Sequence, residues 1–278
     1  MGTNDRRTQN DRPPHARPPA VARPGPPPLP ARTAFVTGAS SGIGRALAVE
    51  LCARGYDVFL AARRTAVLDE LRTELAGVYP QRKVAFTSLD VTDHAAVVSA
   101  LDDAAAQLGG LGIAFANAGA DTEGDIGSGH FSSHRDVIAV NLIGAMATID
   151  AATALFRTQG GGQIVGISSV AASAGLPGGA PYCASKAGLT TYLQALRAET
   201  WKSDITVTTI VPGYIDTPLN EAMGGRRPFL IDTRAGVRKI MDRVESGAHT
   251  AAVPRFRWAL VAGLLRIAPD WMIARSTM

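Results

Sequence analysis

Residues 33–44 read T-A-F-V-T-G-A-S-S-G-I-G, and this stretch decides the fold of the chain. The apolar start predicts a short buried strand, the glycines predict a tight turn, and R-A-L-A-V-E-L-C-A-R at 45–54 has the period of a helix. The free N–H groups and the dipole at the start of such a helix attract anions. Glycines let the backbone approach a pyrophosphate without an intervening Cβ. The stretch therefore predicts a dinucleotide-binding turn, in a variant whose spacing differs from G-x-G-x-x-G.

Strand and helix patterns alternate along the rest of the chain. Apolar runs that predict strands lie at 33–37, 57–62, 83–88, 112–116, 163–168, 205–211 and 250–253, and helical periods lie at 43–54, 65–77, 94–107, 132–157 and 181–202. Continuous rather than alternating apolar strands indicate a sheet that is covered on both faces. The pattern predicts the α/β class, as a Rossmann-type doubly wound parallel sheet of about seven strands with helices on both faces. Ligands of such a sheet bind at the carboxyl ends of its strands.

A second motif, Y-C-A-S-K at 182–186, suggests proton transfer. Tyr182 and Lys186 are four residues apart and share one face of a helix, and Ser169 lies thirteen residues upstream. A free tyrosine has a pKa of about 10, and bringing it to about 7 requires roughly 4 kcal/mol of differential stabilisation, which a neighbouring cation can partly supply. A lone Y-x-x-x-K is usually ordinary helix surface. The glycine turn upstream makes a catalytic pair the better interpretation.

Further motifs accompany these two, namely D-V-T at 90–92, N-A-G at 117–119, N-L-I-G at 141–144, I-S-S at 167–169 and P-G-Y-I-D-T at 212–217. With them the chain resembles the short-chain dehydrogenase/reductase family over residues 32–253. The resemblance implies a nicotinamide-dependent oxidoreductase that reduces a ketone or aldehyde, or oxidises a secondary alcohol, by hydride transfer.

The resemblance also implies roles for individual residues. Tyr182 would be the general acid or base, Ser169 would polarise the carbonyl, Lys186 would lower the tyrosine pKa and bind ribose hydroxyls, and Asn141 would hold a water linking Lys186 to solvent. Ser168 is the rival to Ser169, and Asn141 could instead be a locally satisfied helix residue. The expected cofactor contacts, besides Tyr182 and Lys186, are Gly38, Ser40, Ser41, Gly42, Ile43, Gly44, Arg63, Asp90, Val91, Asn117, Ala118, Gly119, Pro212, Gly213, Ile215 and Thr217.

Cofactor choice depends on the end of the second predicted strand. An acidic residue there would bind the ribose hydroxyls of NAD, but the strand ends with Ala62 and is followed by Arg63 and Arg64. A guanidinium suits a phosphate in charge and in bidentate geometry, and Ser40 could add a hydroxyl. Two solvated arginines at a helix start are the alternative. The pattern favours NADP(H) over NAD(H), with carbonyl reduction as the working direction.

The two ends of the chain differ from this domain. Nine of the first thirty residues are proline, five are arginine and two are aspartate, so residues 1–31 are expected to be a disordered tail. The tail holds +3 of the formal charge of +4, which argues against a nucleic-acid partner. Residues 254–278 form an apolar extension, and 256–268 is a candidate helix that could contact a partner subunit, line the substrate pocket or lie on a membrane surface.

Composition narrows the remaining possibilities. Cys52 and Cys183 are far apart in sequence, which predicts no disulfide and a reduced, cytoplasmic protein. The five histidines show no metal-ligand spacing, so no metal is expected. No apolar run of about 18 residues, the length that spans a bilayer, is expected either. The helices at 132–157 and 181–202 carry many small residues, and in the family such helices form the interface of a homodimer or a D2 homotetramer.

Substrate identity is expected to depend on two stretches, 120–130 and 217–231. The second would be a mobile lid, and its Arg226 and Arg227 could meet an anionic substrate, although a solvated basic turn is the simpler interpretation. Two other functions compete with the reductase. A non-catalytic, redox-sensing NADP-binding regulator would have no need of Ser169, Tyr182 and Lys186. An epimerase or dehydratase would need a G-x-x-G-x-x-G turn and a larger C-terminal domain.

Overall fold

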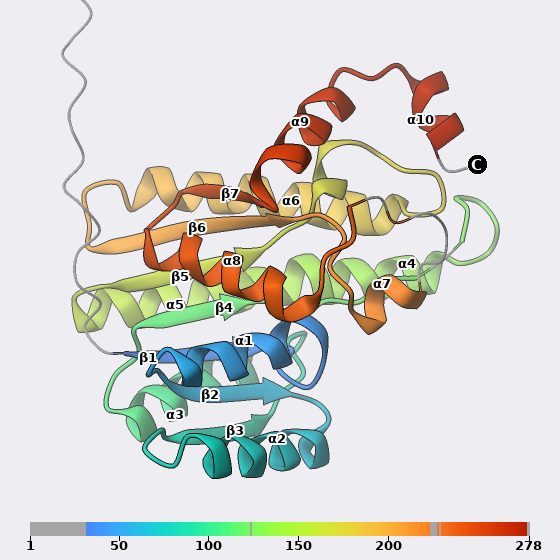
Figure 1. The fold of residues 1–278 in the computed structure, drawn as a ribbon. Helices are drawn as coiled ribbons and strands as arrows, with labels where there is room; N and C mark the ends of the chain where they lie inside the picture. Colours follow the sequence, from blue (N-terminus) through green and yellow to red (C-terminus); the bar gives the residue numbers. More distant parts are fainter. Residues whose placement is uncertain (1–31, 123, 223–226, 228, 277–278) are drawn as a thin grey trace, which may run out of the picture.

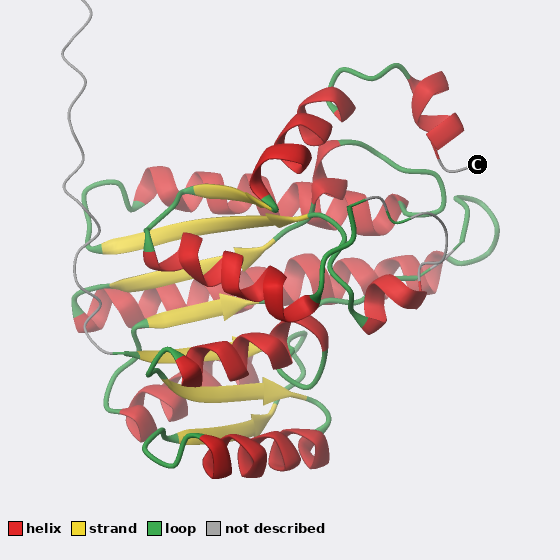
Figure 2. Ribbon diagram, in the orientation of Figure 1, coloured by secondary structure: helices red, strands yellow, loops and turns green. Residues whose placement is uncertain are grey.

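All seven predicted strands are present, and all are parallel, in the order β3-β2-β1-β4-β5-β6-β7 (Figure 2). The computed structural model describes residues 32–122, 124–222, 227 and 229–276. Each strand begins and ends within one residue of its predicted boundary, which confirms the predicted class of fold. The strands are β1 (Thr33–Thr37), β2 (Asp57–Ala62), β3 (Val84–Ser88), β4 (Ile113–Ala116), β5 (Gly162–Ile167), β6 (Ile205–Pro212) and β7 (Thr250–Val253).

Helices cover both faces of this sheet (Figure 1). α1 (Gly42–Ala53), α2 (Thr65–Val78) and α8 (Thr233–Glu245) enclose one apolar cluster. α3 (His94–Leu108), α5 (Ala145–Gln159) and α6 (Ala180–Glu199) enclose the other. Neighbouring strand residues point into opposite clusters, as Phe35 and Val36 do. The strand order reverses between β1 and β4, which places the ligand-binding crevice of this fold at the carboxyl ends of those two strands.

The predicted helix at 132–157 is not continuous. It consists of α4 (Phe131–Ile138), a π-helical segment η1 (Ala139–Gly144) and then α5. A π segment within a helix often marks a functional site, and Asn141 lies inside this one. The helical period of the sequence carries no signal for such a local widening.

Four short or medium helices of the described residues were not predicted. They are the 3-10 helix η2 (Val170–Ser173), α7 (Pro218–Ala222), α8 and α10 (Asp270–Ser276). A signal for α8 does exist in the sequence: Asp232 caps it by accepting a hydrogen bond from the Ala235 N–H at 2.9 Å, and its buried apolar residues recur every three or four positions.

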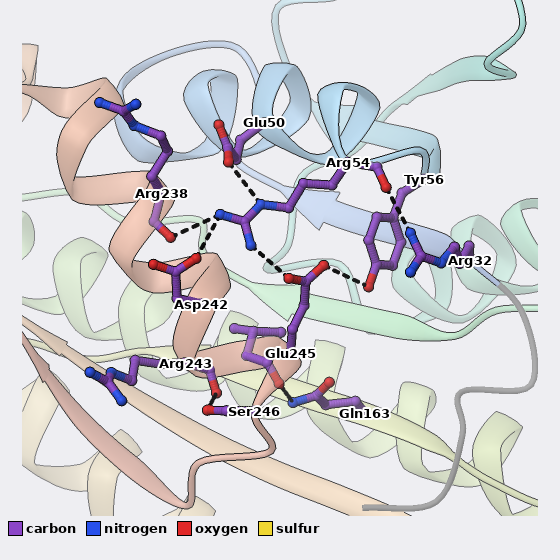
Figure 3. A network of polar contacts seen from close by, with 11 residues as sticks. Arg32, Glu50, Arg54, Tyr56, Gln163, Arg238, Asp242, Arg243, Glu245 and Ser246 are labelled. Atoms are coloured by element: carbon purple, nitrogen blue, oxygen red, sulfur yellow. Dashed lines mark hydrogen bonds and ion pairs between the residues drawn. The ribbon is translucent and has the colours of Figure 1, made fainter.

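Arg54 at the end of α1 joins α1 to α8 (Figure 3). Its guanidinium donates to Glu50 at 2.8 Å, to Asp242 at 2.8 Å and to Glu245 at 2.6 Å. Burial acts to lower the pKa of Arg54, but these hydrogen bonds outweigh it and raise that pKa. Since Glu245 also accepts a hydrogen bond from the Tyr56 hydroxyl, the network fixes the two helices that cover the glycine-turn side of the sheet.

One helical stretch, Phe131–Gln159, is long and apolar enough to cross a membrane by length and composition alone. Asn141 and Asp150 interrupt this stretch, so the sequence still has no uninterrupted apolar run of about 18 residues. Half of the apolar window is buried, and α5 packs against α3, β4 and β5. This packing is that of a core helix.

Beyond β7 the chain continues into α9 (Arg255–Leu265) and α10 (Asp270–Ser276), which extend away from the sheet (Figure 1). These helices correspond to the apolar extension expected from residue 254. α9 packs on η2 and on β7, so its base lies beside the segment that follows Ser169. The expected N-terminal tail, 1–31, lies outside the described residues.

Candidate active site

The glycine turn between β1 and α1 packs directly against the N-A-G segment that follows β4. Gly38 has φ of +68°, and a Cβ there would lie 2.8 Å from the Cα of Ala118. A Cβ on Gly44 would lie 2.3 Å from the Gly38 carbonyl oxygen and 2.6 Å from Asn117 Nδ2. Only glycine fits these two positions without a backbone shift, because real Cβ contacts do not come so close. Close packing thus accounts for two of the three glycines in the turn.

Thr37, which the sequence did not single out, connects the same two segments. Its hydroxyl donates to the Phe115 carbonyl at 3.0 Å and accepts from the N–H groups of Asn117 and Ala118 at 3.0 and 3.1 Å. Asn117 Nδ2 in turn donates to the Thr37 carbonyl at 2.8 Å. Asn117 and Ala118 therefore support the turn structurally, in addition to the cofactor contact predicted for them.

The start of α1 has the features of an anion site. Within the described chain, Ser41 is the N-cap of α1 and makes no side-chain capping hydrogen bond. The first N–H groups of a helix have no partner inside the helix, so those of α1 remain available to an oxygen anion. Gly42 with φ of +52° lets the chain enter the helix here.

At the other end of the site, Tyr182 and Lys186 lie about one turn apart on α6. Lys186 is buried, and its Nζ donates to the Ile167 carbonyl at 2.9 Å and lies 5.7 Å from the centre of the Tyr182 ring. Ser169 is the N-cap of η2; its hydroxyl accepts from the Ala171 N–H at 3.1 Å and also forms a hydrogen bond with Tyr182. Three of the four predicted catalytic side chains, those of Ser169, Tyr182 and Lys186, are therefore brought together.

Ser168, the rival of Ser169, has a different environment. Its hydroxyl donates to the Lys186 carbonyl at 3.1 Å and pairs with the Thr190 hydroxyl at 2.7 Å. These partners tie β5 to α6. Ser168 is thus occupied in a structural contact, and Ser169 is the serine that reaches Tyr182.

The electrostatics of the pair differ from the expectation of a lowered tyrosine pKa. Burial raises the pKa of Tyr182 to about 12, the hydrogen bond with Ser169 acts to lower it, and Asp121 acts to raise it. Burial lowers the pKa of Lys186 to about 8, against the opposing effect of Asp121. Desolvation outweighs the attraction of a cation that lies over the ring rather than at the hydroxyl. Tyr182 is consequently held in its protonated form, which is the form that a proton donor needs.

Asn141 is fully buried and bonded on both sides of its amide. Its Oδ1 accepts from the Ala120 N–H at 2.7 Å, and its Nδ2 donates to the Ala120 carbonyl at 2.8 Å and to Ser185 Oγ at 3.2 Å. A Cβ on Gly119 would lie 3.6 Å from Asn141 Oδ1 and 3.8 Å from Lys186 Nζ. Asn141 and Lys186 thus border one small space, and Asn141 also fixes the segment after the N-A-G motif.

The arginines expected to select the cofactor follow β2, and the structure adds Arg64 to the predicted contact Arg63. Arg64, rather than Arg63, contacts Ser40, with Nη2 and Nε donating to Ser40 Oγ at 2.9 and 3.2 Å. Hydrogen bonds from the Thr92 N–H and hydroxyl lower the pKa of Asp90, and Arg63 lowers it further. Two cations and one hydroxyl therefore surround the end of the crevice.

A cavity of about 300 Å³ joins these two ends. Ser169, Tyr182 and Lys186 line it together with most of the predicted cofactor contacts. The lining contacts are Gly38, Ser40, Ser41, Gly42, Ile43, Gly44, Arg63, Asp90, Val91, Asn117, Ala118, Gly119, Pro212 and Thr217. The cavity is thus lined by the glycine turn, by Arg63 and Arg64 and by the Tyr182–Lys186 pair, at the place where this fold binds a dinucleotide.

Two predicted contacts, Gly213 and Ile215, do not line this cavity. Ile215 is fully buried in the core cluster that contains α8. A Cβ on Gly213 would lie 2.0 Å from Nε1 of Trp258, so the indole of α9 occupies the space beside this glycine. Trp258 is itself buried and packs edge-on against Tyr214, with ring centres 5.5 Å apart. Packing of the C-terminal helix therefore accounts for Gly213.

Within the described residues, no group of three or more His, Cys, Asp or Glu side chains is placed to hold a metal ion. Cys52 and Cys183 are both buried and unbonded to each other. Of the lid stretch 217–231, residues 223–226 and 228 lie outside the described residues, and so does Arg226.

Comparison with known proteins agrees with this geometry. The short chain dehydrogenase family profile matches residues 32–227, and the chain belongs to this family. It is 36% identical over 242 residues to an uncharacterised oxidoreductase of Mycobacterium tuberculosis, covering 87% of this chain and 95% of that one. An uncharacterised oxidoreductase of Myxococcus xanthus is 35% identical over 241 residues, covering 86% and 93%.

Solved structures show the same fold. A short-chain type dehydrogenase/reductase from Mycobacterium marinum aligns with a TM-score of 0.72 and 28% identity, covering 79% of this chain and 91% of that one. An alcohol dehydrogenase from Thermococcus sibiricus, solved with 5-hydroxy-NADP, aligns with a TM-score of 0.71 and 22% identity, covering 80% and 94%. The protein is thus an oxidoreductase of the short-chain dehydrogenase family, with the NAD(P)-binding fold of that family.

Proposed function

We propose that this protein is an NADP(H)-dependent reductase of ketones or aldehydes, with Tyr182 as the proton donor. The observation that carries the proposal is the convergence of Ser169, Tyr182 and Lys186 on one end of the dinucleotide-shaped cavity. The hydroxyl of Ser169 and the phenol of Tyr182 can both reach one carbonyl oxygen, because they already reach each other.

The residues around the cavity supply the binding contacts. The N–H groups at the start of α1 would bind the pyrophosphate, Ser40 with Arg63 and Arg64 would bind a ribose phosphate, and Lys186 would bind the second ribose. When bound, a reduced nicotinamide cofactor would supply the hydride for the carbonyl carbon. Tyr182 then gives its proton to the oxygen, Ser169 holds the developing alkoxide, and Lys186 stabilises the phenolate that remains.

Carbonyl reduction is the direction that we propose. Tyr182 is protonated at neutral pH, because burial raises its pKa to about 12, and the protonated form is the one that donates. Carbonyl reduction consumes one proton from Tyr182, whereas alcohol oxidation would first require its ionisation. The phenolate left by reduction would be reprotonated through the space bordered by Lys186 and Asn141.

The test is a substrate panel with the purified full chain. NADPH absorbance is followed with ketones, aldehydes, quinones, sugars, steroids and acyl thioesters, and NADPH binding is measured separately. Turnover of a carbonyl compound supports the proposal. Tight NADPH binding without turnover of any compound would instead favour the non-catalytic regulator. The presence of Ser169, Tyr182 and Lys186 argues against that alternative.

We also infer a homodimer or homotetramer in the cytoplasm, formed through the α4–α5 run and α6. On that run the side chains of Phe131 and Ile143 are exposed, which suits a helical interface. Light scattering on the full chain tests this inference, and a monomer in detergent-free buffer would contradict it.

A further inference from the structure

The C-terminal helices carry a patch of exposed apolar side chains, which we call the C-terminal patch. It consists of Leu260, Leu264, Ile267, Trp271 and Met272, with exposed fractions of 64, 56, 79, 60 and 49%. Soluble monomers rarely expose so many large apolar side chains close together in the chain, and such patches mark interaction sites. We therefore expect a partner or a surface to cover the C-terminal patch.

The orientation of α9 explains why these side chains point outward. Trp258 is 3% exposed and is fixed in the domain by Gly213 and Tyr214. At 3.6 residues per turn, Leu260 and Leu264 lie on the side of α9 away from Trp258. The buried tryptophan thus anchors the base of the helix, while α9 and α10 extend away from the sheet (Figure 1).

Charge distinguishes the C-terminal segment from the domain that carries it. Residues 254–278 contain four arginines and one acidic residue, Asp270, for a net charge of +3. Residues 32–253 contain 19 basic and 21 acidic residues, for a net charge of −2. Arginines beside exposed apolar and tryptophan side chains are the composition that binds an anionic lipid surface. Arg275 indeed lies over the Trp271 ring, 5.6 Å from its centre.

The segment is suited to lie on a bilayer and not to cross it. α9 has 11 residues and α10 has 7, whereas a spanning helix needs about 20. Residues 266–269, which include Pro269, separate the two helices. A second copy is a less favourable occupant, since a two-fold contact between patches would place two segments of charge +3 against each other.

We propose that the C-terminal patch docks this protein on an anionic membrane surface. Because α9 packs on η2, which follows Ser169, docking brings the catalytic end close to the lipid. Resting on the proposed reductase function, this position suits carbonyl substrates that partition into the bilayer. The docking itself does not depend on catalysis, so it can be tested without any substrate.

The test is co-sedimentation of the full chain with vesicles of phosphatidylcholine alone and of phosphatidylcholine containing phosphatidylglycerol. We expect binding to the anionic vesicles that weakens as salt rises, since exposed charges are screened. The variant Leu264→Glu/Ile267→Glu should bind at least about 10-fold more weakly, because it removes apolar contacts and adds negative charge. The control, Val78→Glu, changes an exposed apolar residue of α2 and should bind like the parent.

Light scattering and thermal unfolding of all three proteins complete the experiment. An unchanged melting temperature shows that a binding defect is not unfolding. The proposal is overturned if the parent does not bind anionic vesicles, or if the double variant binds as well as the parent. It is also overturned if the parent does not bind vesicles and the double variant has a lower oligomeric state than the parent. The patch would then be an interface between copies.

Discussion

The ammonium of Lys186 lies over the ring of Tyr182, 5.7 Å from its centre, and donates its hydrogen bond to the Ile167 carbonyl at the end of β5. Tyr182 and Lys186 are thus adjacent. Among the described residues, the ammonium makes no direct hydrogen bond to the phenol. This arrangement leaves the phenol protonated and the lysine partly depleted of its proton at mild alkaline pH.

A pH dependence follows from these two groups. The pKa of Lys186 is lowered to about 8, so the ammonium is present below pH 8 and is lost above it, while Tyr182 keeps its proton up to about pH 12. We expect kcat/KM for reduction to be flat at neutral pH and to fall above about pH 8. Lys186→Arg should move that fall to higher pH, because a guanidinium does not titrate in this range. A profile unchanged by this substitution would show that another group titrates.

Cofactor preference should depend on both arginines after β2. Arg64→Ala and Arg63→Ala should each raise the Kd for NADPH about 10- to 100-fold, since a hydrogen bond to a charged group contributes about 1.5–3 kcal/mol. The Kd for NADH should change little. Arg72→Ala, an exposed arginine of α2 paired with Asp69, is the control. Equal affinity of the parent for NADPH and NADH, measured by titration, would refute the preference.

The contact between Gly213 and Trp258 predicts a steric defect. Gly213→Ala places a methyl group where the indole lies, and overpacking of this kind costs about 1–3 kcal/mol. Gly263→Ala, on the same helix α9 as Trp258, is the matched control, since a Cβ there meets no described atom within 4 Å. We expect a lower melting temperature only for Gly213→Ala. In a Trp258→Ala background the substitution Gly213→Ala should cost less than in the parent, and an equal cost in both backgrounds would mean that the indole is not the obstacle.

The Arg54 network should contribute to stability and not to catalysis. Arg54→Ala leaves Glu50, Asp242 and Glu245 without their shared cation, and we expect about 1–3 kcal/mol less free energy of unfolding. Denaturant unfolding measures this loss. The kcat should stay at the parent value, because the network joins the end of α1 to α8 (Figure 3), whereas the cavity lies at the start of α1. A comparable loss of kcat would connect the network to the site.

Local sequence signals predicted the elements well and their mutual contacts less well. Strand boundaries followed from short apolar runs, and the glycine turn and the Tyr182–Lys186 pair followed from fixed spacings. The missed features depend on contacts between distant segments. Arg64 contacts Ser40, which is 24 positions away in the sequence. Glycine is required at 213 because of Trp258, which lies on a helix beyond residues 32–253 that resemble the family. Helical periodicity also cannot show the π segment that holds Asn141.

The tyrosine pKa illustrates the same limit in energetic terms. The spacing of Tyr182 and Lys186 predicted attraction between a cation and a phenolate, and therefore a lowered pKa. The direction depends on how strongly the phenol is desolvated, which is a property of the packed site and not of the spacing. The pair of residues was found from the sequence, but the sign of the effect required the structure.

The most direct test of the account is the variant Tyr182→Phe, assayed for turnover and for NADPH binding on the same preparation. The ring still packs beside Lys186 but has no proton to transfer, so we expect kcat to fall about 10²- to 10⁴-fold while the Kd for NADPH stays close to that of the parent. Retention of more than about a tenth of the parent kcat would contradict the assignment of Tyr182 as the general acid.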